Sequence, residues 1–153
     1  MRAENSGESN LPDFKEKLNI CLVSAPYYKD ITDNLIRGAL NILEKINANI
    51  EIVEVSGALE IPTAIKLMEN KFDGFIAIGC VIRGETTHYE IVSAESSRGL
   101  TQLGLEKICI GNAILTVENI LQAKKRANPK TFDKGGEACR ALLGIIKIKE
   151  RNH

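Results

Sequence analysis

The hydrophobic positions of this chain form short continuous runs that alternate with stretches of helical spacing. Four apolar runs predict strands, over residues 18–25, 49–55, 73–82 and 107–115. Five amphipathic stretches predict helices, over residues 30–46, 61–70, 86–106, 116–127 and 133–150. Strands that alternate with helices in this way favour right-handed βαβ units. We therefore expect an α/β fold in which helices cover both faces of a four-stranded parallel sheet.

The length of the chain and the position of its polar residues predict a single domain. With 153 residues, the chain falls in the usual size range for one hydrophobic core. Residues 1–16 are polar and contain Gly, Ser and Asn, so we expect them to form a flexible tail. Residues 17–153 then form the domain, without a linker or an internal repeat.

Charge and cysteine content argue against several functional classes. Twenty basic side chains balance twenty acidic ones, which gives no sign of a nucleic-acid-binding or polybasic membrane surface. The apolar runs are too short to span a bilayer, and the first residues lack the apolar stretch of a signal peptide. The four cysteines are scattered and show neither a C-x-x-C pair nor zinc spacing. We therefore expect a cytoplasmic protein with reduced, buried thiols.

Polar residues directly after the predicted strands indicate a ligand-binding edge. In open α/β sheets, ligands bind beyond the carboxyl ends of the strands. The four exit loops would bring Tyr27, Glu60, His88 and Asn112 to that edge. A tyrosine there can stack on a planar ring or simply cover the rim of the core. The carboxylate can accept hydrogen bonds from substrate hydroxyls or complement the N-terminus of the next helix.

The segment "GCVIRGETTHYE", residues 79–90, predicts a turn from strand to helix that could bind an anion. Gly84 permits a tight turn, and Thr87 with Glu90 matches a capping box. The backbone amides near Glu85 and Thr86 would then lie at the positive end of the helix dipole, where phosphate binds well. A helix that is merely well capped has the same pattern.

His88 is the only internal histidine, since the other is the last residue of the chain. A helix N-terminus disfavours the charged ring, and a neutral histidine can accept and return a proton in general acid–base catalysis. A surface or packing role is the alternative. No serine or cysteine forms an obvious triad with His88, and no second internal histidine is present to share a metal, so we expect no metal.

A run of basic residues lies between positions 124 and 134. Lysine and arginine at the end of a helix normally form a solvated face that complements the helix dipole. If one of these side chains meets a phosphate, the planar guanidinium of Arg126 suits bidentate contact best.

Three parts of the sequence resemble one enzyme family closely. They are "SGALEIP", "GCVIRGETTHYE" and "ILTVENILQAKKRA" followed by "DKGGEA". Over nearly the whole chain the sequence is similar to lumazine synthase (6,7-dimethyl-8-ribityllumazine synthase), the penultimate enzyme of riboflavin biosynthesis. The resemblance implies a three-layer flavodoxin-like sandwich. It also implies a transferase that joins 5-amino-6-(D-ribitylamino)uracil to L-3,4-dihydroxy-2-butanone 4-phosphate, without cofactor or metal.

The resemblance also implies roles for individual residues. His88 matches the general acid–base residue of the family. Residues that match substrate-binding positions are Tyr27, Ala58, Leu59, Glu60, Cys80, Val81, Ile82, Glu85, Thr86, Asn112, Arg126 and Lys134. By this resemblance the aromatic ring stacks on the pyrimidine and residues 58–60 bind the ribityl chain and uracil. Residues 80–82 offer strand backbone to the pyrimidine edge.

The phosphate ligands implied by the resemblance come from two subunits. The amides of Glu85 and Thr86 hold the phosphate from one side, and Arg126 and Lys134 supply the basic groups. In the family these two basic residues, together with residue 112, belong to a neighbouring subunit. The resemblance therefore implies a homo-oligomer with its active sites at subunit boundaries.

Departures from the family pattern affect the expected assembly. Asn112 stands where many members have an aromatic residue, which preserves backbone contacts but not ring packing. The segment "ANPKTFD" (127–133) lacks the glycines of members that form capsid-like shells, and Pro129 restricts its backbone. We therefore predict a pentamer. Two other functions fit the same fold: a non-catalytic flavin- or phosphate-binding module, and an assembly protein in which His88 is dispensable.

Overall fold

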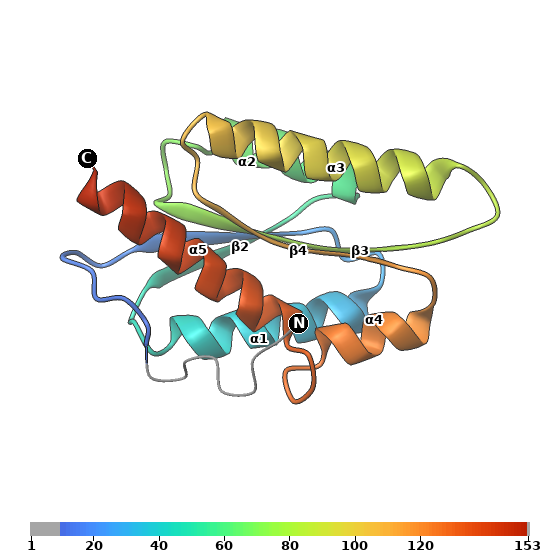
Figure 1. Cartoon of the computed structure of the whole chain (residues 1–153), viewed down its shortest axis with the longest axis horizontal. Coiled ribbons are helices and arrows are strands. Elements are labelled where there is room, and N and C mark those ends of the chain that lie inside the picture. Colours follow the sequence, from blue (N-terminus) through green and yellow to red (C-terminus); the bar gives the residue numbers. More distant parts are fainter. Residues whose placement is uncertain (1–9, 153) are drawn as a thin grey trace.

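A computed structural model describes residues 10–152, and residues 1–9 and 153 lie outside the described part of the chain. Strands and helices follow one another along the described chain (Figure 1). The elements are β1 (Asn19–Ser24), α1 (Lys29–Leu43), β2 (Asn49–Glu54), the 3₁₀ turn η1 (Ala58–Glu60), α2 (Ile61–Leu67), β3 (Gly74–Ile82), α3 (His88–Leu105), β4 (Ile110–Val117), α4 (Ile120–Ala127) and α5 (Lys134–Arg151).

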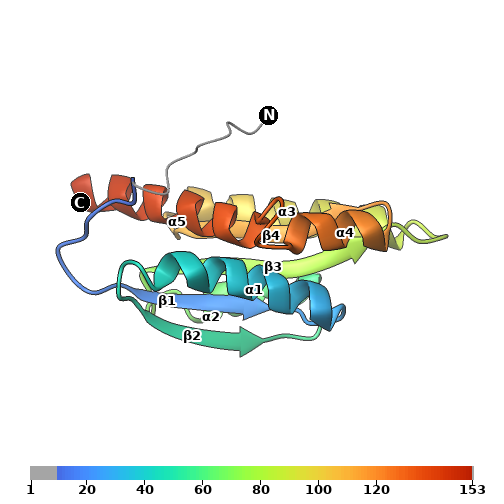
Figure 2. The ribbon, with the colours of Figure 1, turned by 90° about the horizontal axis from the view of Figure 1, so that it is seen from below.

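Within residues 10–152 the strands form one parallel sheet of four strands, in the order β2-β1-β3-β4. Figure 2 shows β1, β2 and β3 running in the same direction, and β4 pairs parallel to β3. The prediction of an α/β fold with a four-stranded parallel sheet is therefore confirmed. The chain order reverses between β1 and β3, because β2 lies outside β1 and β4 lies outside β3. Such a switch point opens a crevice at the carboxyl ends of the two central strands, where ligands of this fold class bind.

Helices cover both faces of the sheet, as predicted, and the molecule has three layers (Figure 1, Figure 2). α1, α4 and α5 pack on one face, and α2 and α3 pack on the other. Strand side chains alternate between the two faces: Leu22 and Ile76 face the first group of helices, whereas Val23 and Phe75 face the second. Because both of its faces are buried, the sequence of β3 is continuously apolar, as is typical of a central parallel strand.

The helix layer of α1, α4 and α5 is close-packed because α5 begins against the middle of α1. A Cβ atom at Gly135 would overlap the backbone oxygen of Leu35, and one at Gly38 would overlap the Asp133 carboxylate. Asp133 adopts a left-handed conformation (φ 48°) and accepts a hydrogen bond from the Gly136 amide (3.2 Å) at the start of α5. Glycines at this crossing therefore fix where α5 begins.

Residues before β1 also contact the domain. Leu11 and Phe14 pack against the core beneath α1 and α5, and Lys147 lies over the Phe14 ring, 5.5 Å from its centre. Lys147 Nζ donates a hydrogen bond to the backbone oxygen of Asp13 (2.5 Å). The segment 1–16, predicted as a flexible tail, thus includes core-contacting residues, and its first nine residues lie outside the described part.

The predicted boundaries differ most from the structure at β4, which spans 110–117 instead of 107–115. Lys107 has a positive φ of 74°, and its amide donates to the Gly104 oxygen (3.0 Å), so the chain is still turning at the end of α3. β4 then pairs with β3 as far as Val117. Asn112 consequently lies inside the strand, opposite Ala77, and the prediction that it lies in an exit loop is wrong.

Candidate active site

One part of the site is a stretch of β3 that extends beyond β1. β1 pairs with β3 only as far as Ser24↔Ile78, whereas β3 continues alongside β4 to Ile82. In the described chain, the backbone of residues 80–82 therefore has no strand partner on the β1 side, at the switch point of the sheet. N–H and C=O groups of this kind need hydrogen-bond partners, and a flat heterocyclic ligand can supply them.

The side chains of this stretch hold the strand in the core. Cys80 packs in the cluster beneath α1 and α5, and Val81 packs in the cluster beneath α2 and α3. Burial raises the pKa of the Cys80 thiol to about 11, so the thiol is protonated near neutral pH and is a poor nucleophile. The contribution of these residues to a ligand site is therefore their backbone.

The exit loop of β1 presents an exposed aromatic ring at the same edge. Tyr27 is 80% exposed, and its ring makes an edge-to-face contact with Tyr28 at 4.9 Å between ring centres. Most of the Tyr27 ring covers no core, which favours the stacking role over the rim-covering alternative.

The exit of β2 leads into η1, which carries Ala58, Leu59 and Glu60. Ala58 is buried, whereas Leu59 is 39% exposed. The Glu60 carboxylate accepts a hydrogen bond from Ser56 Oγ (3.0 Å) and makes no capping hydrogen bond to α2. A carboxylate oxygen has more than one lone pair, so this group can accept further hydrogen bonds from ligand hydroxyls.

The loop between β3 and α3 is exposed, and α3 begins at His88 with Thr87 in the N-cap position. The His88 amide donates to Thr86 Oγ1 (3.3 Å). Residues 85 and 86 thus come just before the N-cap of an 18-residue helix, whose positive dipole end favours a bound anion.

The capping box predicted for Thr87 and Glu90 is not formed. Thr87 makes no side-chain capping hydrogen bond, and the Glu90 carboxylate instead pairs with Arg83 (2.5 Å). A hydrogen bond from the Glu90 backbone N–H and then the Arg83 guanidinium hold the pKa of the Glu90 carboxyl below its usual range. The prediction failed because a guanidinium seven residues earlier competes for this carboxylate.

His88 is exposed at the first position of α3, next to the end of β3. This exposure argues against a packing role for His88 and leaves a surface role as the alternative to catalysis. An exposed imidazole beside the switch point can exchange protons with a ligand held there. The structure therefore brings His88 together with Tyr27, residues 58–60, residues 80–82 and the loop amides along one edge of the sheet.

Arg126 and Lys134 lie in a different layer of the molecule. Arg126 is in the last turn of α4, where its Nη1 donates to the Gln122 backbone oxygen (3.3 Å) and its guanidinium lies 5.7 Å from the Phe132 ring centre. Lys134 begins α5 and pairs with Glu137 (3.2 Å). Both helices pack on the face opposite α3, so the sheet lies between these cations and His88 (Figure 1).

Asn112 is also separate from this edge. Its Oδ1 accepts a hydrogen bond from the Ile114 amide (2.9 Å), and it shares a face of β4 with Ile110 and Ile114. β4 is an outer strand of the sheet, so its far edge faces away from the molecule. A single chain therefore leaves three of the predicted site residues apart from the others.

Comparison with known proteins establishes the family. Residues 17–150 match the family model described as 6,7-dimethyl-8-ribityllumazine synthase. Curated proteins of that name from Novosphingobium aromaticivorans, Erythrobacter litoralis and Jannaschia sp. are 48%, 49% and 43% identical to the chain. The alignments cover 85%, 85% and 97% of this chain and 95%, 94% and 84% of those proteins. The chain belongs to the lumazine synthase family.

Membership of the lumazine synthase family confirms the resemblance seen in the sequence. The match spans almost all of the described domain and includes each of the three segments that carried the resemblance. The family consists of enzymes, so the prediction of a transferase is confirmed, and the non-catalytic binding module is not favoured.

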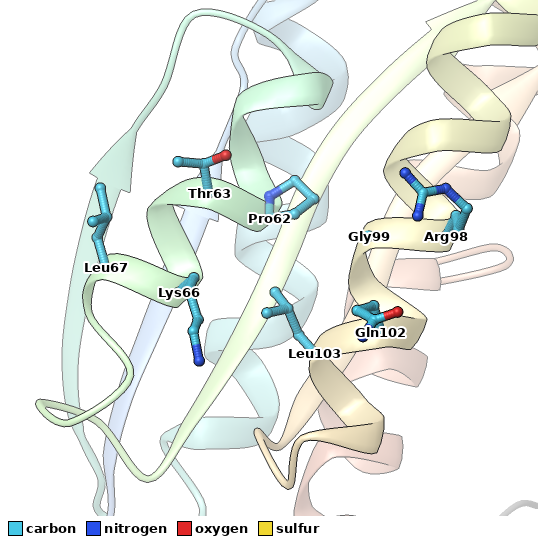
Figure 3. Close-up of a pocket in the computed structure, with 8 residues that line it drawn as sticks. All are labelled: Pro62, Thr63, Lys66, Leu67, Arg98, Gly99, Gln102 and Leu103. Atoms are coloured by element: carbon cyan, nitrogen blue, oxygen red, sulfur yellow. The ribbon is translucent and has the colours of Figure 1, made fainter.

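A surface hollow of about 340 Å³ lies between α2 and α3 (Figure 3). Its lining residues come from both helices and are Pro62, Thr63, Lys66, Leu67, Arg98, Gly99, Gln102 and Leu103. The cations of this hollow are already paired, Lys66 with Glu69 and Glu106, and Arg98 with Glu95. None of the predicted site residues lines it.

Residues 10–152 contain neither a candidate metal site nor a candidate membrane-spanning helix. No group of three or more His, Cys, Asp or Glu side chains among them could hold a metal ion. No helix in this part of the chain is long and apolar enough to cross a membrane. A reaction without metal or cofactor, as expected for a lumazine synthase, stays a prediction.

Two features of the candidate site were not predicted from the sequence. The open backbone of β3 follows from the unequal lengths of β1 and β3, six and nine residues, which the apolar runs indicated only in part. The second feature is the set of contacts made by Arg83. Its partner Glu118 is 35 residues away, so no local pattern reveals the pair.

Proposed function

We propose that this protein condenses 5-amino-6-(D-ribitylamino)uracil with L-3,4-dihydroxy-2-butanone 4-phosphate to give 6,7-dimethyl-8-ribityllumazine in riboflavin biosynthesis. The family match over residues 17–150 supports this reaction. The observation that carries the proposal is the meeting of an exposed ring, open strand backbone and an exposed histidine at the switch point of the sheet. The enzyme is proposed to act in the cytoplasm.

The pyrimidine substrate fits the groups at the ends of β1, β2 and β3. The open backbone of residues 80–82 can pair with the polar edge of the uracil ring. The exposed ring of Tyr27 can stack on its face. Residues 58–60 lie beside this position, and the Glu60 carboxylate can accept hydrogen bonds from the ribityl hydroxyls.

The phosphate of the second substrate fits the N-terminus of α3. Backbone amides at residues 85 and 86 and the helix dipole favour an anion there. A phosphate bound at this place would also put the reacting carbons next to His88. The charge of the departing phosphate needs cations, and we assign that role to Arg126 and Lys134 of a second copy of the chain.

His88 is proposed to move protons in each step. An amine of the pyrimidine attacks the ketone, and water leaves to form an imine. Loss of a carbon-bound proton then expels the phosphate, and the second amine closes the ring with loss of another water. Each step transfers protons between nitrogen, carbon and oxygen, so one imidazole near the phosphate amides can serve as both acid and base.

The separation of the basic residues supports an assembly with shared sites. Because α4 and α5 pack on the opposite face of the sheet from α3, an assembly could bring Arg126 and Lys134 of one subunit to His88 of another. We propose a homopentamer with active sites at subunit boundaries. The turn after α4 supports this size over a larger shell, since Thr131 and Asp133 donate backbone hydrogen bonds to the Asn128 oxygen and compact the turn.

Turnover of the two substrates tests the proposed function directly. Purified protein should produce the fluorescence of the lumazine product when both substrates are present. His88→Ala should slow turnover about a hundredfold or more, because general acid–base catalysis contributes at least that much. The variant should still bind inorganic phosphate, since the amides remain. Unchanged turnover in His88→Ala would remove the acid–base role, and lack of product with the unaltered protein would refute the function.

A further inference from the structure

Arg83 connects three parts of the structure at the edge that holds the candidate active site. Its Nε donates to Glu118 (2.8 Å), just after β4, and its Nη1 donates to Glu90 in the first turn of α3 (2.5 Å). Its guanidinium also lies over the ring of Tyr89, 4.4 Å from the ring centre. The Arg83 amide continues the β3–β4 pairing by donating to the Val117 oxygen (2.9 Å).

The loop that Arg83 spans has little support of its own. Residues 84–87 are exposed, and a Cβ atom at Gly84 would meet no other atom within 4 Å. In the described chain, the loop takes part in short-range hydrogen bonds, from the His88 amide to Thr86 and from the Ile91 amide to Thr87. The side-chain contacts of Arg83 therefore join the two ends of this loop to each other and to β4.

Glu118 is itself held in place. Its amide donates to the side-chain oxygen of Gln122 (2.8 Å), and Asn119 caps α4 by accepting a hydrogen bond from the Gln122 amide (2.9 Å). The contact from Arg83 to Glu118 thus ties the beginning of α3 to a fixed point at the end of β4 and the start of α4.

The arrangement argues against a direct role for Arg83 in binding phosphate. Two carboxylates accept its hydrogen bonds and balance its charge, and a tyrosine ring covers one face of the guanidinium. A bidentate contact with phosphate would require these partners to be displaced.

We propose that Arg83 is a positioning residue that fixes the first turn of α3, and with it His88, relative to β3 and β4. This inference rests on the proposed function, because it assigns His88 the proton transfers. The ion pairs of Arg83 are about half exposed and exposed pairs contribute little to stability, so the effect of Arg83 lies in the geometry of the turn.

Steady-state kinetics of Arg83→Gln separates positioning from binding. Misplacement of a catalytic group by a fraction of an ångström lowers the rate of the chemical step, so kcat should fall about tenfold to a hundredfold. The KM values of both substrates, and the inhibition constant of inorganic phosphate, should stay within about twofold of the unaltered protein. Arg83→Lys keeps the charge but not the fork of donors, so it should restore part of kcat.

Arg98→Gln is the matched control. It removes an exposed arginine that lies in the second half of α3 and pairs with Glu95. Its kcat should equal that of the unaltered protein. Glu118→Gln removes one partner of Arg83 and leaves the arginine in place, so it should lower kcat in the same direction as Arg83→Gln. This second variant gives a test that does not depend on the folding of Arg83→Gln.

Histidine NMR gives a structural readout that does not depend on turnover. The chain has two histidines, and His88→Ala identifies the resonance of His88. That resonance should shift in Arg83→Gln and stay unchanged in Arg98→Gln. An unchanged kcat and resonance in Arg83→Gln would overturn the inference, as would a large rise in the phosphate inhibition constant. If the unaltered protein gives no lumazine product, the proposed function fails, and if His88→Ala keeps full turnover, the acid–base role of His88 fails; both outcomes are seen without any Arg83 variant, which distinguishes them from a failure of this inference.

Discussion

Individual residues at the candidate site divide by exposure into two kinds of contribution. Cys80 and Val81 are buried, so they offer a ligand only their backbone. Tyr27 and His88 are exposed, so they offer side chains. A substitution at a buried position should therefore affect ligand binding by changing the shape of the strand. Substitutions at the exposed positions should act on stacking and proton transfer.

Burial of the thiols predicts a loss of stability at alkaline pH. Cys139 is fully buried, and burial raises the pKa of its thiol from 9.0 to about 12. Between these values the unfolded chain loses a proton that the folded chain keeps, so the stabilising contribution is complete below pH 9 and declines above it. The free energy of unfolding should therefore fall by up to about 1.4 kcal/mol per pH unit for this group.

Urea denaturation between pH 7 and pH 11, with reductant present, measures this effect. Other groups titrate in the same range, so the informative quantity is the difference between the unaltered protein and Cys139→Ala. The variant should be less stable at neutral pH because of the cavity, and its stability should decline less steeply at high pH. Equal slopes in the two proteins would show that Cys139 does not titrate differently on unfolding.

At the scale of elements, the hydrophobic pattern correctly predicted the type of each helix and strand and the side chains that it buries. The stripe of Leu35, Ala39 and Leu43 is buried in α1, as an amphipathic pattern requires. The continuous apolar run of β3 correctly indicated a strand covered on both faces. These predictions succeeded because burial of apolar side chains decides the position of an element in the layers.

The ends of elements depended on contacts that the local sequence does not contain. Glu90 pairs with Arg83 instead of completing a capping box with Thr87. Asn112 is poorly suited to a strand by propensity, yet it lies within β4, paired opposite Ala77. In both cases a tertiary partner outweighs a weak local preference.

The contact between α5 and α1 predicts opposite effects for two glycines of the same helix. In Gly135→Ala the new methyl group would overlap the backbone oxygen of Leu35, which cannot rotate away, so the protein should lose about 1–3 kcal/mol or more of stability. In Gly144→Ala the methyl group meets nothing within 4 Å, and the better helix propensity should add up to about 1 kcal/mol.

Chemical denaturation of both variants at one protomer concentration checks this prediction, since assembly makes stability depend on concentration. The matched pair controls for the general effect of alanine in a helix. If Gly135→Ala were as stable as Gly144→Ala, α5 would not be seated against α1 as closely as the structure indicates.

At the scale of the whole molecule, the predicted site residues are distributed over the two helix layers of the chain. His88 begins α3 on one face of the sheet, while Arg126 ends α4 on the other. Pairing between subunits can bring these residues together when the same two surfaces meet repeatedly around a ring, because every boundary then contains one complete set of residues. The proposed pentamer is the closed form of such an arrangement.

Shared sites predict that two inactive variants restore activity when they assemble together. His88→Ala lacks the proposed acid–base group, and Arg126→Ala lacks the proposed phosphate ligand. In a ring formed from equal amounts of both, about a quarter of the boundaries should combine an intact His88 with an intact Arg126 from the neighbouring chain. Activity should rise toward that fraction of the unaltered protein after the two variants are unfolded and refolded together.

The control is a mixture of the two variants that are refolded separately, which should stay at the low activity of each. Sedimentation of the co-refolded sample should give the same assembly as the unaltered protein, so that recovered activity reports on shared sites. If each site were built within one chain, every chain in the mixture would carry a defect and co-refolding would restore nothing. Recovery therefore requires that His88 and Arg126 meet across a boundary, as we propose from the position of α3 and α4 on opposite faces of the sheet.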